Sequence, residues 1–316
     1  MVKRQTPASA TLLGITTLVL GMLIFSLQDI AVKWIGGDYP VLQIVILRSL
    51  VALPFAFLFL RAEGLRGLPR TPQLWLEVVR GFLLFLSFTT YMMGLAALPL
   101  ADMAALRNSG PLMITLLSVA VLRERVSLRH WLALLVGFAG VLLIVQPGSA
   151  TFNLGSVFAL LAALFYAIAT IITRQLRATD SSAVMGYYTS LIYVLAGLIL
   201  APLALFAGEH PGAHPSIAFL FRPWAMPTLL DGAIMGGLGI VWAIAMLFIA
   251  RAYSLTQASV AAPFEYTSLL FNLIWGLLLW REVPSALVLA GAVLIVASGI
   301  AILAFQRKQQ PQPGGR

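Results

Sequence analysis

The chain has 316 residues, of which 60% are hydrophobic and 10% charged, and it carries a formal net charge of +9. Soluble domains contain roughly 45 to 50% apolar and ~25% charged residues, so this composition excludes an ordinary soluble protein and indicates an integral membrane protein. Cysteine is absent from the sequence, which excludes disulfides, thiolate catalysis and cysteine-ligated metals.

Ten apolar stretches follow one another along the chain, each near the length of roughly 20 residues that an α-helix needs to cross a bilayer. We predict membrane spans at residues 11–35, 40–60, 73–95, 101–122, 128–146, 153–174, 181–206, 227–251, 257–279 and 285–305. Turn and capping residues lie in the gaps between these stretches. The expected fold class is therefore an all-α integral membrane protein with ten transmembrane helices.

The second half of the chain repeats the first. An Arg-Glu-x-x-Ser motif lies between two apolar stretches at Arg123 to Ser127 and again, 158 residues later, at Arg281 to Ser285. Earlier segments correspond at an offset of 141 residues, which places Phe25 opposite Tyr166. An internal duplication of about half the chain therefore organises the sequence.

The two halves are predicted to be inverted relative to each other. Because each half contains an odd number of spans, five, the second half enters the membrane from the opposite side to the first. Inverted repeats allow a helical bundle to alternate between inward-open and outward-open forms around a midplane site. We predict an amino-terminal segment at 1–10, a first repeat at 11–150, a second repeat at 151–306 and a tail at 307–316.

Basic residues predict the orientation in the membrane. If the amino terminus lies in the cytoplasm, the cytoplasmic segments contain fourteen of the twenty Lys and Arg residues, and the opposite side contains only Lys33, Arg222 and Arg281. Basic loops are retained on the cytoplasmic side, so both termini are expected there, in a bacterial inner membrane. Contact of these loops with anionic lipid explains the positive net charge, and we expect no nucleic-acid partner.

Two carboxylates within the spans are candidates for substrate or proton binding, because a buried charge costs about 3 kcal/mol at the bilayer centre on insertion scales. Asp29 shares a helix face with Lys33 and either meets a substrate ammonium or pairs with Lys33 near the outer surface. Glu265 lies on a polar stripe with Asn272 and corresponds to Asn108 of the first repeat. Glu265 either binds a proton or an ammonium group, or pairs with an arginine to hold helices together.

The arginines within the spans are candidate carboxylate ligands, because a planar guanidinium group forms paired hydrogen bonds to a carboxylate. Arg107 precedes a proline in the middle of its span, where freed backbone groups make room for a cavity; binding and structural roles are both open. For Arg48 we favour a structural role such as neutralising Asp29. Glu77 and Arg80, three residues apart, are expected to form an interfacial ion pair.

Aromatic residues in the spans could form the walls of a ligand site or serve in packing; the candidates are Tyr91, Tyr166 and Trp242. The sequence contains no GxxxxGK[ST], HExxH or GxSxG motif, and these are the patterns of ATP-binding loops, zinc proteases and serine hydrolases. We therefore expect no enzymatic activity, no cofactor and no metal.

With the Arg-Glu-x-x-Ser motif and a glycine-containing final helix in both halves, residues 11–305 resemble the drug/metabolite transporter superfamily, specifically proteins with paired EamA domains. The aromatic amino-acid exporters of this superfamily are similar in length and helix count. The resemblance implies a basket-shaped bundle whose cavity is lined mainly by spans 1, 3, 4, 6, 8 and 9. These helices carry Asp29, Tyr91, Arg107, Asn108, Tyr166, Trp242 and Glu265.

The working hypothesis is a secondary transporter that exports small metabolites by alternating access, above all amino acids, among which aromatic and hydrophobic ones are candidates. The carboxylate of a zwitterion is expected near Arg107 and its ammonium near Asp29 or Glu265. Uptake or exchange of another solute, such as a nucleotide-type metabolite or S-adenosylmethionine, stays open, as do a membrane scaffold and an intramembrane enzyme. Substrate, driving force and the choice between monomer and homodimer are not determined by the sequence.

Overall fold

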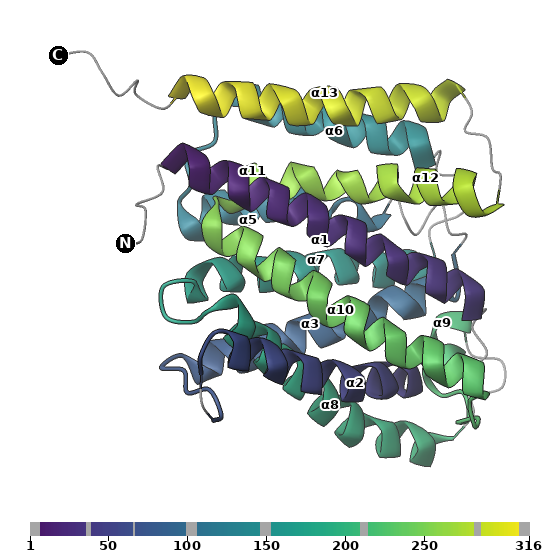
Figure 1. The fold of residues 1–316 in the computed structure, drawn as a ribbon. Helices are drawn as coiled ribbons and strands as arrows, with labels where there is room; N and C mark the ends of the chain where they lie inside the picture. Colours follow the sequence, from purple (N-terminus) through teal and green to yellow (C-terminus); the bar gives the residue numbers. More distant parts are fainter. Residues whose placement is uncertain are drawn as a thin grey trace.

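The computed structural model describes residues 7–35, 39–65, 67–98, 106–145, 153–208, 214–280 and 286–309, and this part of the chain consists of helices and the turns between them (Figure 1). Within this part of the chain, six helices are by themselves long and apolar enough to cross a membrane. They are α1 (Pro7–Ile35), α2 (Val41–Ala62), α3 (Leu74–Leu95), α7 (Leu154–Leu176), α8 (Ser182–Ala207) and α10 (Leu229–Leu255). The chain is an all-α, multi-pass membrane protein.

A seventh candidate span, Ala258–Leu279, is not one continuous α-helix. It begins with α11 (Ala258–Ala261), passes through a 3₁₀ turn η1 (Ala262–Tyr266) and continues as α12 (Thr267–Trp280). Pro263 lies in η1 and lacks the N–H that an α-helix needs. The sequence predicts an uninterrupted span at 257–279, whereas the structure breaks it at the turn that contains Glu265.

Three further helices of the described chain lie where the fourth, fifth and tenth spans are predicted, and each contains an apolar stretch of only 10 to 17 residues. These are α5 (Gly110–Leu122), α6 (Leu128–Val145) and α13 (Ala286–Gln309). The segment between α8 and α10, which contains four prolines, includes a short helix, α9 (Pro215–Leu220). His214 caps α9, since its ring Nδ1 accepts a hydrogen bond from the N–H of Ser216 at 3.4 Å.

Helices from the two halves of the chain pack against one another in pairs. Helix α1 packs along α10 and α3 packs along α7, while α2 contacts α8 and α6 contacts α13. Exchanging the first and second predicted repeats turns the α1–α10 pair into the α7–α3 pair and leaves the other two pairs unchanged. This pattern of contacts is what two equivalent halves produce. The helices lie side by side across the bundle in Figure 1.

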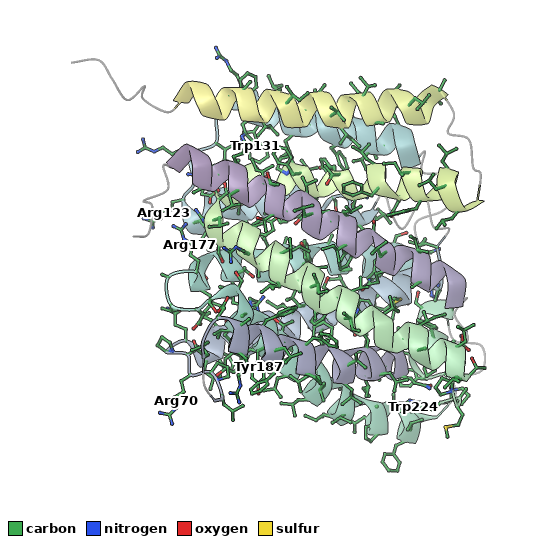
Figure 2. The ribbon with its side chains drawn as sticks, viewed as in Figure 1. Arg70, Arg123, Trp131, Arg177, Tyr187 and Trp224 are labelled. Atoms are coloured by element: carbon green, nitrogen blue, oxygen red, sulfur yellow. The ribbon has the colours of Figure 1, made fainter. Side chains whose placement is uncertain are left out.

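Helix α1 begins and α13 ends at the same end of the bundle, on the left of Figure 1. Figure 2 shows Arg70, Arg123 and Arg177 at this end and Trp224 at the opposite end. These three arginines, which the sequence predicts to face the cytoplasm, therefore lie at the end of the bundle where α1 begins and α13 ends.

Two pairs of helices cross at a glycine, and at each crossing the backbones of the two helices are in direct contact. A Cβ atom added to Gly239 of α10 would lie 2.2 Å from the carbonyl oxygen of Arg48 in α2. A Cβ atom added to Gly140 of α6 would lie 2.6 Å from the carbonyl oxygen of Gly291 in α13. Small residues let helices approach closely in a membrane, where van der Waals packing is a main driving force for association.

Candidate functional site

The carboxylate of Glu265 is held by two tyrosines from different helices. Its Oε1 atom accepts a hydrogen bond from the hydroxyl of Tyr166 in α7 at 2.8 Å and another from the hydroxyl of Tyr253 in α10 at 2.5 Å. Glu265 is 8% exposed, and the η1 turn directs it between these helices. Hydrogen bonds to a carboxylate are stronger than those between neutral groups, so this arrangement offsets part of the cost of a buried acidic residue.

Arg107 lies in the same polar centre, against two aromatic rings. Its guanidinium carbon is 5.0 Å from the ring centroid of Tyr91 in α3 and 5.3 Å from that of Phe25 in α1. These distances suit an attraction between the cation and the ring faces. The Arg107 charge also interacts electrostatically with Glu265 and Tyr166. The centre therefore combines a cation, an anion and aromatic side chains from four helices.

Residues at equivalent positions of the two sequence repeats contact the two charged groups of this centre, Phe25 beside Arg107 and Tyr166 on Glu265. Phe25 of the first half corresponds to Tyr166 of the second, and Asn108, which follows Arg107, corresponds to Glu265. Phe25 and Tyr166 both pack between the same two hydrophobic clusters. The repeat thus explains why Phe25 contributes to the site, although aromatic character alone did not single it out.

A second cluster surrounds Arg48, which is 0% exposed. Its Nη1 atom donates a hydrogen bond to Oε1 of Gln28 in α1 at 3.2 Å. Its guanidinium carbon lies 3.8 Å from the ring centroid of Phe88, 5.0 Å from that of Trp242 and 5.3 Å from that of Tyr193. Trp242, a candidate cavity residue, therefore contacts Arg48. Among the side chains that the structure describes, Arg48 forms no ion pair; the pairing expected with Asp29 lies outside them.

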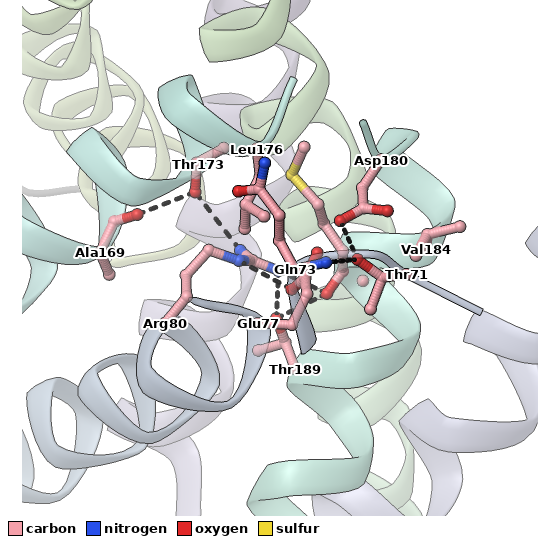
Figure 3. Close-up of polar contacts among 12 residues, drawn as sticks. Thr71, Gln73, Glu77, Arg80, Ala169, Thr173, Leu176, Asp180, Val184 and Thr189 are labelled. Carbon is pink, nitrogen blue, oxygen red and sulfur yellow. Dashed lines mark hydrogen bonds and ion pairs between the residues drawn. The ribbon is translucent and has the colours of Figure 1, made fainter. Parts of the chain in front are cut away.

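Glu77 and Arg80 form an ion pair inside the bundle, with Arg80 Nε 3.3 Å from Glu77 Oε2 (Figure 3). Arg80 Nη2 donates hydrogen bonds to the hydroxyl of Thr189 at 2.7 Å and to the carbonyl oxygen of Met185. Its Nη1 reaches the hydroxyl of Thr173 at 3.4 Å. Both charged side chains are buried, so the ion pair lies between helices and joins the first turns of α3 to α7 and α8.

The glutamate of the first Arg-Glu-x-x-Ser motif caps the broken ninth span. Oε1 of Glu124 accepts a hydrogen bond from the N–H of Ala258 at 3.1 Å, and Oε2 accepts bonds from the N–H of Ser259 at 3.1 Å and its hydroxyl at 2.6 Å. The His130 ring contacts the carbonyl oxygen of Ser259 at 2.8 Å. Such side-chain acceptors satisfy the free N–H groups at the start of a helix.

Local backbone geometry directs Glu124 toward this cap. Arg123 adopts a left-handed conformation with φ 54°, which ends α5, and the N–H of Glu124 bonds to the carbonyl oxygen of Ser118 at 3.1 Å. Arg174 of α7 lies 4.0 Å from Oε1 of Glu124. It also donates to the carbonyl oxygen of Tyr253 at 3.3 Å, which links the cap to the helix that supports Glu265.

The remaining candidate residues are Asn108, Asn272, Asp29 and Lys33. Asn108 lies in the turn after Arg107, and Asn272 lies on α12 beyond Glu265; both are partly buried. Asp29 and Lys33 lie on α1, but their side chains are outside the described part of the structure. Within the described residues, no group of three or more His, Asp or Glu side chains could hold a metal ion.

Several residues around the charged groups were not predicted from the sequence: Tyr253, Gln28, Phe88 and Tyr193. Tyr253 precedes Glu265 by twelve residues, across the turn between α10 and α11, and no helical spacing connects them. The repeated Arg-Glu-x-x-Ser motif identifies Glu124 in the sequence, but it does not indicate that Glu124 caps α11.

The model of the EamA-like transporter family matches the chain twice, at residues 12–146 and 153–304. The pseudopaline exporter CntI of Pseudomonas aeruginosa is 31% identical over 295 residues, which cover 92% of this chain and 95% of the exporter. The S-adenosylmethionine uptake transporter of Rickettsia prowazekii is 25% identical, covering 93% and 94% of the two chains. The riboflavin transporter of Vibrio cholerae is 28% identical, covering 85% of each chain.

A protein of known crystal structure has a similar fold. Its TM-score against this chain is 0.74 at 18% sequence identity, and the match covers 96% of this chain and 99% of that chain. A likeness at this level of identity concerns the arrangement of helices alone.

Proposed function

Because the chain belongs to the EamA-like transporter family of the drug/metabolite transporter superfamily, we propose that this membrane transporter exports a small zwitterionic metabolite of the amino-acid type. Transport proceeds by alternating access between two inverted five-helix repeats, with ten spans in all. Both termini lie in the cytoplasm, and the membrane is the bacterial inner membrane.

The observation that carries the proposal is the presence of Arg107 and Glu265 in one polar centre. Arg107 binds the carboxylate of the substrate through its planar fork, and Glu265 accepts hydrogen bonds from the ammonium group. The rings of Phe25 and Tyr91, which flank Arg107, contact the substrate side chain. An ionisable residue that faces the interior of a membrane bundle marks a functional site by default, and here two of opposite charge interact.

The hydrogen bonds of Glu265 connect the substrate to helix movement. Tyr166 and Tyr253 bind the same oxygen from α7 and α10, and an arriving ammonium group competes with both hydroxyls for the carboxylate. The cap that Glu124 forms holds α11 at the end of the bundle where α1 begins. Release of this cap, together with the change at Glu265, frees the broken ninth span to open the site toward the cytoplasm.

Export is the direction that we favour. The relative that is 31% identical is named as an exporter, whereas the relatives named as S-adenosylmethionine uptake transporters are 25% identical. Uptake is the alternative, and the orientation of flux in the experiment below separates the two.

The test is mass spectrometry of metabolites that leave proteoliposomes preloaded with a mixed pool of amino acids and other metabolites, with and without a pH gradient. We expect selective loss of amino-acid-type zwitterions. Arg107→Gln and Glu265→Gln should each abolish this loss, whereas Arg177→Gln, which removes an exposed arginine, should not. If correctly folded protein releases no zwitterion in either orientation, the proposal is wrong.

A further inference from the structure

Arg48 has hydrogen-bonding capacity that the protein does not use. Its Nη1 atom bonds to Gln28, and the hydroxyl of Tyr193, which donates to the carbonyl oxygen of Leu84, interacts electrostatically with the guanidinium group. Neither Nε nor Nη2 forms a hydrogen bond with any described residue. The residue is 0% exposed, and leaving donors of a buried charged group unpaired is costly. A purely structural arginine in this position is expected to have all of its donors satisfied.

The two unpaired atoms form one edge of the guanidinium group. Phe88, Trp242 and Tyr193 lie within 3.8 to 5.3 Å of the guanidinium carbon, measured to their ring centroids. Gln28 occupies Nη1 on the other edge. The N–H groups of Nε and Nη2 point in the same direction, and this is an edge with which arginine grips both oxygens of a carboxylate.

Arg48 and Arg107 approach the same two helices. Arg107 contacts Phe25 of α1 and Tyr91 of α3, and Arg48 contacts Gln28 of α1 and Phe88 of α3. On each helix the two contacted residues are three positions apart, which is about 4.5 Å along the axis and on neighbouring parts of one face. The two arginines therefore belong to adjoining parts of one interior surface.

We propose that Arg48 is a second carboxylate-binding residue of the translocation site and that the substrates are amino-acid derivatives with two carboxylates and one amino group. This inference rests on the proposed function and specifies its substrate class. Arg48 and Arg107 each take one carboxylate, and Glu265 takes the protonated amine. These three charged groups together carry a net charge of +1, which complements the net charge of −1 on such a molecule.

The test compares two probes: phenylalanine, which has one carboxylate, and N-(1-carboxyethyl)phenylalanine, in which a 1-carboxyethyl group on the nitrogen adds a second carboxylate. Binding to the purified protein is measured by isothermal titration calorimetry, and efflux is measured in proteoliposomes. The wild-type protein should bind the dicarboxylate more tightly than phenylalanine, by about tenfold or more as expected for one added charge-assisted contact. Arg48→Gln should weaken binding of the dicarboxylate more than binding of phenylalanine and so abolish this preference. Arg61→Gln, an exposed arginine of the same helix, is the matched control.

A second variant keeps the test decisive if Arg48→Gln does not fold. Gln28→Glu retains Arg48 and places a carboxylate beside its Nη1 atom, so the dicarboxylate preference should fall while phenylalanine binding persists. Folding of each variant is checked by size-exclusion chromatography and thermal unfolding.

Two results would overturn the inference. One is a wild-type protein that binds and exports phenylalanine without preferring the dicarboxylate; this leaves the proposed function intact. The other is an equal loss of both probes in folded Arg48→Gln and Gln28→Glu proteins, which would make Arg48 a structural residue. Absence of binding and efflux for both probes with wild-type protein would instead count against the proposed function itself, and the inference would fail with it.

Discussion

Replacing Glu124 by glutamine tests whether the first Arg-Glu-x-x-Ser motif anchors the broken ninth span. The carboxylate accepts hydrogen bonds from the N–H of Ala258 and from the N–H and hydroxyl of Ser259, at 3.1, 3.1 and 2.6 Å. Glutamine can keep the bond to Ala258, and the hydroxyl of Ser259 can turn to accept from the new amide. The N–H of Ser259 is then left facing an NH₂ group.

The expected change in the free energy of unfolding follows from these hydrogen bonds. A buried donor without a partner costs roughly 1 to 3 kcal/mol, and the surviving bonds lose the strengthening that a charged acceptor provides. We therefore expect Glu124→Gln to lower the free energy of unfolding by about 2 kcal/mol, a value in the upper part of the range for loss of a helix cap. Denaturant titration of the purified protein in detergent, followed by circular dichroism, measures this change.

A cysteine-labelling assay reports directly on movement of α11 away from its packed position. Because the chain contains no cysteine, a single Val260→Cys substitution in α11 gives a clean reporter at a position that is 1% exposed. A water-soluble maleimide should react faster with this cysteine when Glu124→Gln is also present. Glu63→Gln, at an exposed carboxylate, is the control and should leave the rate unchanged.

Two outcomes would refute the reasoning. The first is an unfolding free energy within about 0.5 kcal/mol of the wild-type value, the usual range for surface substitutions away from such features, with an unchanged labelling rate. The second is a double-mutant cycle in which Glu124→Gln and Ser259→Ala are additive, because residues that share hydrogen bonds should show a coupling energy.

Three further predictions concern stability, each measured by unfolding in detergent. Gly239→Ala should destabilise by about 1 to 3 kcal/mol through overpacking, because its Cβ would lie 2.2 Å from a carbonyl oxygen of α2, whereas Gly237→Ala, with no atom within 4 Å, should be nearly neutral. Arg80→Met should cost about 3 to 5 kcal/mol because it leaves Glu77 buried and unpaired; adding Glu77→Leu should recover part of the loss. Asn153→Ala should cost about 1 kcal/mol, because it removes the acceptor that caps α7.

Much of the fold is readable from the sequence because it depends on local composition. Runs of apolar residues predicted the membrane helices α1, α2, α3, α7, α8 and α10, and their order along the chain follows directly. The ninth span is the exception. Hydropathy averages over the window and does not register Pro263, so the 3₁₀ turn that carries Glu265 was predicted as continuous helix.

The candidate site was predictable only in part. Charged residues inside apolar stretches identified Glu265 and Arg107, because a membrane interior penalises a charge that has no role. The partners of these residues were not predictable in the same way. Tyr253 reaches Glu265 only because the chain turns back between α10 and α11, and Arg48 meets Trp242 only because α2 and α10 cross at a glycine.

The sequence by itself determined that this protein is a helical membrane protein built from a duplicated unit, and it identified which charged residues are unusual. Both conclusions rest on properties that neighbouring residues share along the chain: apolar length, repeat spacing and the cost of a charge in lipid. Only the tertiary structure decided which side chains meet. It showed Glu124 capping α11 and Glu77 with Arg80 inside the bundle, because the rotation of each helix about its own axis is set by packing against other helices.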